Sequence, residues 1–216
     1  MNGQDPLQYL TWLGARSAGL VAFGLAAAGV IVGLAMSTSK AGKRRRVAAR
    51  KDLHEQLALA ALVAIALHGV LLLSDRWLRP GVVGILVPFA APYRPLWTGL
   101  GVLAAYFAAL FGLSYYARRL VGARRWRKLH RFTPIIYVLS AMHMLGAGSD
   151  SGTLWLRGLV VATAVPIAVL LALRLAEAYR RSGAAARSAR EPAARVVHED
   201  RLDVLVGEHA LLAERR

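Results

Sequence analysis

The sequence of 216 residues contains no cysteine. Without thiols the chain cannot form disulfide bonds, bind a cysteine-ligated iron–sulfur cluster or attach haem covalently through a C-x-x-C-H motif. The absence does not identify the redox compartment in which the protein works.

Charged residues are also scarce, at 19% of the chain, and the 12 acidic residues are outnumbered by 28 Lys and Arg. The charges are clustered, so that long stretches carry none, while 56% of the residues are hydrophobic and the mean hydropathy is positive. A soluble domain of this size is more charged and less apolar. Because a bilayer core requires roughly 20 consecutive apolar residues per helix, these stretches predict an integral protein of the lipid bilayer.

The apolar runs predict an all-α helical bundle of about five transmembrane helices. They lie at residues 15–36, 54–73, 96–116, 130–145 and 154–175. Residues 79–95 are apolar as well, but this stretch is short and interrupted by glycine and proline. We interpret it as an interfacial or re-entrant cap that is too rich in proline for a stable helix.

The positions of these runs divide the chain into three predicted parts. Residues 1–14 form an outer N-terminal segment without the basic start and cleavage site of a signal peptide. Residues 15–176 form the transmembrane domain, and residues 177–216 form a basic cytoplasmic tail. The tail is expected to be extended at first and to form a short amphipathic helix from residue 201 onward.

Basic residues predict the orientation in the membrane. Of the 28 Lys and Arg, 23 lie in the basic loops 40–51 and 118–131 or from Arg174 onward. With five spans, these segments share one face, which the positive-inside rule makes cytoplasmic. The N-terminus is then outside and the C-terminus inside. Topology therefore accounts for the net charge without a nucleic acid partner, and the excess of arginine and alanine is typical of a bacterial protein, here in the cytoplasmic membrane.

Four of the six histidines lie at the ends of two predicted spans, where a polar residue is costly and usually functional. His54 and His68 are separated by about 21 Å of helix, and His130 and His143 by about 20 Å. Both spans run from inside to outside. We therefore expect His54 and His130 to pair near the cytoplasmic face, and His68 and His143 to pair near the outer face.

Two histidines per site favour haem over other metals. Zinc requires three or four protein ligands, and no carboxylate accompanies these histidines. Haem iron already has four equatorial nitrogens, so two axial imidazoles complete it and leave no position for oxygen, which favours electron transfer. The pattern predicts two b-type haems.

On the fourth predicted span, the two histidines do not fall on the same face of a straight helix. On a straight helix His68 lies within about 40° of the face of His54, but His143 lies about 140° from that of His130. Pro134 follows His130 by four residues and removes a helical hydrogen bond. We expect a kink or bulge at Pro134 to correct the phase.

At these residues the chain resembles the ferric reductase-like transmembrane domain family. The family includes the membrane parts of NADPH oxidases and ferric reductases and the haem subunit of a periplasmic methionine sulfoxide reductase. The matching stretches are HEQLALAALVAIALH (54–68), WRKLHRFTPIIYVLSAMH (126–143) with the GAGSD that follows, ARSAGLVAFGL (15–25) and VPFAAPYRPLW (87–97). The resemblance spans about residues 12–176 and implies that the four histidines are axial haem ligands.

The chain departs from this family in two ways. The family usually has six spans, whereas about five are predicted here. Eukaryotic members continue into flavin and nicotinamide domains, but only about 36 residues follow the last predicted helix, without a nucleotide-binding motif. We therefore expect no bound flavin or nicotinamide in this chain.

Smaller expectations concern other residues. Arg16 and Arg94 lie near the depth of the outer haem, where they can pair with its propionates or extend to the lipid headgroups. Arg127 and Arg131 can pair with propionates of the inner haem in the same way, although topology already accounts for their charge. Tyr137, Met142 and Met144 are expected to pack rather than to bind a metal. The G-x-G at 99–101 is expected to allow close helix packing. No metal role is expected for His198 and His209.

Three functions remain open at this point. The first is transmembrane electron transfer by the membrane component of a ferric reductase-like oxidoreductase, with a separate cytoplasmic reductase as donor and an acceptor outside. The second is a quinol-linked haem anchor for another redox enzyme. The third is a non-redox membrane scaffold or transporter, which predicts no haem.

Overall fold

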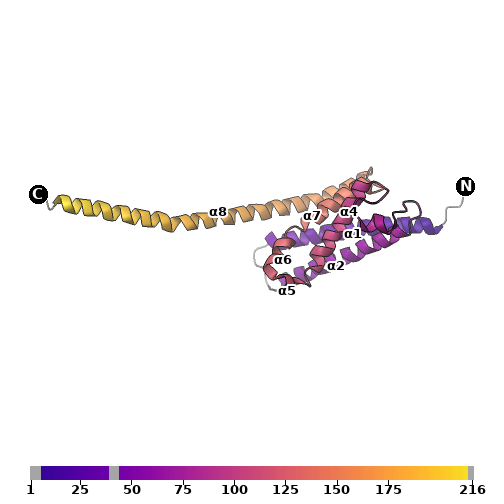
Figure 1. Ribbon diagram of the computed structural model, residues 1–216, viewed down its shortest axis with the longest axis horizontal. Helices are drawn as coiled ribbons and strands as arrows, with labels where there is room; N and C mark the ends of the chain where they lie inside the picture. The colour runs from indigo at the N-terminus through magenta and orange to yellow at the C-terminus, as the bar shows by residue number, and fades with distance from the viewer. Residues whose placement is uncertain (1–5, 39–43, 214–216) are drawn as a thin grey trace. The chain divides into compact units, whose positions relative to one another are not determined.

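The computed structural model describes the backbone of residues 6–38 and 44–213 and the side chains of residues 9–38 and 47–184. Within these residues the chain forms α-helices and no strands, which confirms the all-α prediction (Figure 1). The helices are α1 (Pro6–Thr38), α2 (Arg44–Leu73), α3 (Gly81–Leu86), α4 (Pro95–Leu113), α5 (Arg118–Val121), α6 (Ala123–His130), α7 (Pro134–Ala147) and α8 (Leu154–Ala213). The chain divides into two compact units, Met1–Leu170 and Leu171–Arg216, and the candidate site lies in the first.

Four of the described helices are long and apolar enough to cross a membrane. They are Tyr9–Thr38 in α1, Val47–Leu73 in α2, Pro95–Leu113 in α4 and Leu154–Ala184 in α8. Large apolar side chains such as Val63 and Val161 are 69% and 59% exposed in the middle of these helices, where lipid is their natural solvent. The membrane character of the chain is therefore supported by the length, composition and apolar exterior of its helices.

The fifth predicted span is shorter than expected. Helix α7 has 14 residues, which gives about 21 Å against a hydrocarbon core of about 30 Å. The predicted run at 130–145 is divided, because α6 ends at His130 and α7 begins at Pro134. Proline is well tolerated at the first position of a helix, where its missing N–H is not needed.

Several helix ends differ from the sequence prediction. Helix α1 begins at Pro6, inside the segment predicted to precede the first span, and α2 begins at Arg44, inside the first basic loop. The second basic loop forms α5 and α6. Arg, Lys and Ala are strong helix formers, so a charged segment next to a span can continue its helix in water.

Two other predictions of irregular structure were wrong. The cap at 79–95 contains the short helix α3, which starts after Pro80 in a position that tolerates proline. The tail is not extended at first, since α8 continues without interruption to Ala213. Its frequent Ala, Arg, Leu and Glu all favour a helix. The expected change of structure at residue 201 is therefore absent.

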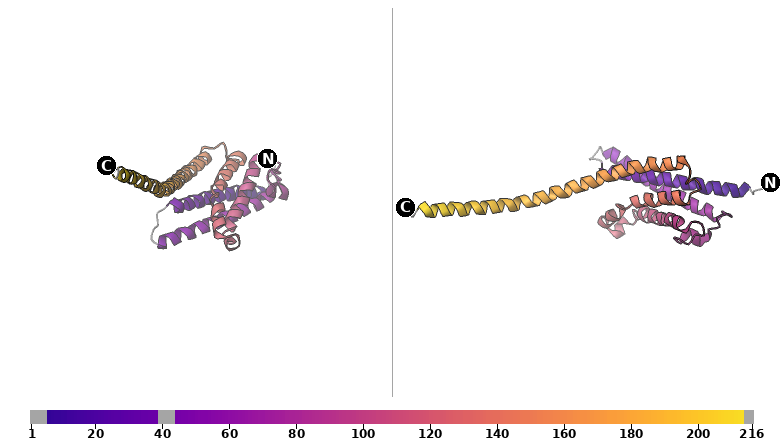
Figure 2. Two further views of the ribbon diagram at one scale, coloured as in Figure 1. Left: turned by 60° about the vertical axis from the view of Figure 1, so that its left-hand side comes forward. Right: turned by 90° about the horizontal axis from the view of Figure 1, so that it is seen from above.

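Helices α1, α2, α4 and α7 pack together in one bundle (Figure 2). His54 and His68 lie on α2 and His143 on α7, whereas His130 is the last residue of α6. Helix α1 packs along α2 and also contacts α7, while α4 packs along α7 and touches α2. The buried residues of α1 are mostly small. They include Ala15, Ala18, Ala22 and Ala27. Small residues allow helix backbones to approach closely in a membrane.

The glycines of the G-x-G in α4 also serve close packing. A Cβ atom on Gly99 would collide with the ring of Phe89, and one on Gly101 would lie 2.5 Å from His143 Nδ1. Both residues thus leave room for a neighbouring ring.

Candidate functional site

Two histidine pairs lie between α2 and the α6–α7 segment. The ring centres of His54 and His130 are 5.9 Å apart, with an angle of 87° between the ring planes. Those of His68 and His143 are 6.4 Å apart, at 76°. The structure therefore places side by side the same residues that the helical spacing pairs.

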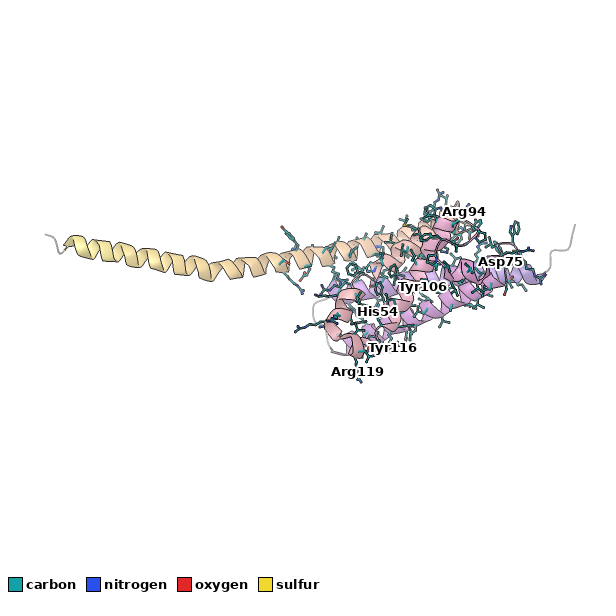
Figure 3. All side chains as sticks on the ribbon, viewed as in Figure 1. His54, Asp75, Arg94, Tyr106, Tyr116 and Arg119 are labelled. Atoms are coloured by element: carbon teal, nitrogen blue, oxygen red, sulfur yellow. The ribbon has the colours of Figure 1, made fainter. Side chains whose placement is uncertain are left out.

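The two pairs belong to opposite ends of the bundle. In Figure 3, His54 lies at the end marked by Tyr116 and Arg119, whereas Asp75 and Arg94 mark the other end. The chain is helical throughout from His54 to His68, which are fourteen positions apart, so the pairs are separated by about 21 Å along α2.

The break before α7 changes the phase between His130 and His143. The N–H groups of Arg131, Phe132 and Thr133 bond to the third preceding carbonyl, as do those of Ile135 and Ile136. Winding of this kind advances each residue by about 120° instead of 100°. Over residues 131–136 the gain is about 120°, close to the 140° by which a straight helix misses.

Three of the four histidines are held by a backbone carbonyl. His54 Nδ1 donates to Gly29 O at 3.0 Å, His68 Nδ1 donates to Ala15 O at 2.7 Å, and His143 Nδ1 donates to Trp97 O at 2.9 Å. A carbonyl oxygen can only accept, so Nδ1 carries the hydrogen and Nε2 keeps a lone pair. This is the arrangement that orients a metal-binding imidazole.

The geometry suits one metal ion between each pair. Bonds from an imidazole nitrogen to a metal are about 2.0–2.1 Å long, so two imidazoles on opposite sides of one ion have ring centres on the order of 6 Å apart. Among the described residues there is no group of three or more His, Cys, Asp or Glu placed to bind a metal. A pair of histidines suits an ion that brings its other ligands with it, as haem iron does.

Aromatic and basic residues surround the His54–His130 pair. Trp126 stacks on His130 with ring centres 4.8 Å apart, and its indole N–H is buried without a hydrogen-bond partner. Tyr115 contacts Trp126 edge-on at 5.8 Å, and the guanidinium of Arg118 lies 3.9 Å from the Tyr115 ring. Arg127 and Arg131 are exposed beside this cluster.

The two arginines expected near the outer haem each have a partner. Arg16 forms an ion pair with Asp150 at 2.6 Å and lies over the Trp12 ring. Arg94 Nη1 donates to Gly146 O at 2.5 Å. Both lie close in sequence to residues whose carbonyls hold the His68–His143 pair, since Arg16 directly follows Ala15 and Arg94 precedes Trp97 by three residues.

Among the residues whose side chains are described, the remaining predicted residues have no identified contact with the four paired histidines. Tyr137 is buried and its hydroxyl donates to Val160 O at 2.9 Å, so it joins α7 to α8. Met144 is buried and Met142 is exposed. His198 and His209 lie in the part of α8 whose side chains are not described.

Sequence reasoning missed Trp126 and the three carbonyl acceptors. Trp126 precedes His130 by four residues, a spacing that places both on one face of α6 and could have indicated the stack. No residue type marks the carbonyls in the same way, because every residue has one and the register between helices selects which of them accepts.

A comparison of the chain with protein-family models, with curated proteins and with solved structures found no match to any of them.

Proposed function

We propose that the chain transfers electrons across the bacterial cytoplasmic membrane through two b-type haems, as the membrane component of a ferric reductase-like oxidoreductase. His54 and His130 are the axial ligands of the inner haem, and His68 and His143 those of the outer haem. The observation that carries the proposal is the pairing of the four rings at 5.9 and 6.4 Å.

The hydrogen bonds of the histidines support the same assignment. A histidine that only packs inside a bundle has no need to keep Nε2 available, yet His54, His68 and His143 all donate through Nδ1. When bound, haem supplies an iron that changes its oxidation state by one electron without binding oxygen.

Donors for the propionates are present at both ends. Arg16 and Arg94 each use part of a guanidinium that offers five N–H groups, so each retains donors for an outer propionate. At the inner haem, the buried indole N–H of Trp126 would gain an acceptor.

Five crossings are part of the proposal. The three-residue turn before α7 adds about 6 Å to its 21 Å, and the remaining mismatch of a few ångströms is within what a bilayer accommodates by local thinning. With α7 as a crossing, the basic segments share the cytoplasmic face and the N-terminus lies outside.

The spectrum and haem content of the purified protein test the proposal. We expect close to two noncovalent haems per chain, low-spin in both oxidation states. His54→Ala and His130→Ala should each reduce the content to about one haem by removing the inner site, and His68→Ala and His143→Ala should do the same at the outer site. His209→Ala is the control and should retain both. A full two-haem spectrum from any of the four site variants would remove that residue from the ligands.

A second candidate is a quinol-linked haem anchor, which the same histidine pairs support. The donor distinguishes the two functions. Reduction of the haems by a quinol analogue alone would favour the anchor, with quinone as a further cofactor. Reduction that requires a separate cytoplasmic reductase would favour the reductase-fed component. Rapid reduction by NADPH or NADH with no other protein would show a nicotinamide site in the chain.

A further inference from the structure

Each carbonyl that accepts from a histidine is followed, four residues later, by a glycine. Ala15 is followed by Gly19, Gly29 by Gly33, and Trp97 by Gly101. Each of these glycines touches the same histidine as its carbonyl. A Cβ atom would lie 3.0 Å from His68 on Gly19, 3.1 Å from His54 on Gly33 and 2.5 Å from His143 on Gly101.

Helix geometry explains this spacing. The carbonyl of residue i accepts from the N–H of residue i+4, and the Cα–Cβ bond of residue i+4 leans back toward that carbonyl. A side chain at i+4 therefore covers the oxygen, whose second lone pair is otherwise open. Glycine at i+4 leaves the oxygen accessible to a donor from a neighbouring helix.

We propose that Gly19, Gly33 and Gly101 are positioning residues that open the carbonyls of Ala15, Gly29 and Trp97 to the imidazoles. By allowing the Nδ1–H bond, each glycine fixes the tautomer of its histidine and directs Nε2 toward the partner ring. The hydrogen bonds themselves are observed and do not depend on haem. The consequence for haem rests on the proposed function.

The spacing of the two glycines on α1 matches the spacing of the two histidines on α2. Gly19 and Gly33 are fourteen residues apart, as are His68 and His54 on the antiparallel α2. One alignment of α1 against α2 therefore supplies both histidines with an acceptor and a glycine. Gly101 does the same for His143 from α4, so each proposed haem has at least one ligand held in this way.

Close helix packing is the competing explanation, because small residues also gather where helices touch. Gly24 provides the matched control. It lies on α1 between Gly19 and Gly33, and nothing is within 4 Å of the Cβ that alanine would add. The change Gly24→Ala thus alters the same helix without meeting a histidine.

The experiment compares Gly33→Ala, Gly19→Ala and Gly101→Ala with Gly24→Ala in the full chain. Haem content and the midpoint potential of each haem are measured. Loss of the Nδ1 hydrogen bond makes an imidazole less basic, which destabilises ferric iron and raises the midpoint potential. Gly33→Ala should raise the potential of the inner haem alone, and Gly19→Ala that of the outer haem alone.

The size of the effect should follow the contact distances. Gly101→Ala has the shortest contact and should weaken retention of the outer haem by about 10- to 100-fold, the usual effect of losing an outer-shell partner. Gly33→Ala requires a shift of only a few tenths of an ångström, so it should fold and retain both haems. Potentials and haem contents equal to those of Gly24→Ala in all three variants would overturn the proposal.

A second measurement does not depend on haem. In haem-free protein labelled with nitrogen-15 in histidine, the ring nitrogen shifts report which nitrogen carries the hydrogen. His54 should be the Nδ1–H tautomer in wild type and in Gly24→Ala, and a mixture in Gly33→Ala. The same tautomer in all three proteins would overturn the positioning role. Failure of the wild type to bind haem would instead count against the proposed function.

Discussion

At the scale of single residues, the angle between the paired rings has a spectroscopic consequence. The planes meet at 87° in the His54–His130 pair and at 76° in the His68–His143 pair. When two axial imidazoles are nearly perpendicular, the two iron d orbitals that interact with them become nearly equivalent. We predict that both ferric haems give strongly anisotropic low-spin electron paramagnetic resonance signals. Ordinary rhombic signals would show that the rings turn parallel when haem binds.

The ring of Trp126 gives a second prediction at this scale. Because it stacks on His130 at 4.8 Å, Trp126→Ala should loosen the imidazole and weaken retention of the inner haem, by about fivefold for the loss of an aromatic contact of about 1 kcal/mol. Trp126→Phe keeps a stacking ring and should retain the haem. Haem content after dilution or gel filtration measures the difference. Equal loss from both variants would assign the effect to the indole N–H rather than to stacking.

At the scale of helices, Pro134 separates α6 from α7 and so sets the phase between His130 and His143. We predict that Pro134→Ala extends one continuous helix through this point and turns the two histidines apart by up to about 140°. The haem content should then fall below two per chain. Pro166→Ala is the control, because α8 is already continuous through Pro166. Unchanged haem content in Pro134→Ala would show that tertiary contacts hold the turn without the proline.

The helices that are long and apolar enough to cross a membrane could largely be predicted from apolar runs, because the length of a run and the thickness of a bilayer constrain each other. Their ends could not. Charges indicate where the membrane stops, but Arg44–Lys51 continue α2 beyond that point because they are good helix formers.

The candidate site, too, could be predicted from the sequence only in part. The pairing of His54 with His130 and of His68 with His143 follows from spacing along helices, which the sequence contains directly. The acceptors for Nδ1 depend on the register between helices, which one sequence does not display. A signal was nevertheless present, since Gly19 and Gly33 have the same spacing as His54 and His68.

At the scale of the whole molecule, the absence of cysteine makes the topology directly testable. A single cysteine introduced at the exposed Ser149, after α7, should react with an impermeant reagent added outside intact cells. One introduced at Leu120 in α5, where the side chain is 91% exposed, should react only after permeabilisation.

These two positions are separated by α6 and α7 alone. Reaction of both from the same side would mean that α7 does not cross, in keeping with its 14 residues. Reaction of Ser149→Cys only from the cytoplasmic side would reverse the assignment of inner and outer haems.

The order of the chain also determines when the two sites can be completed during synthesis. His54 and His68 reach the membrane early with the α1–α2 hairpin, which already contains the carbonyls of Gly29 and Ala15 that orient them. Their partners, His130 and His143, arrive only after α4 and the basic segment of α5 and α6 have been made. A nascent chain that ends before α6 thus presents two oriented histidines on separate levels and no pair. Insertion of the two proposed haems would therefore be a late event in biogenesis, and the two sites would become competent within thirteen residues of each other.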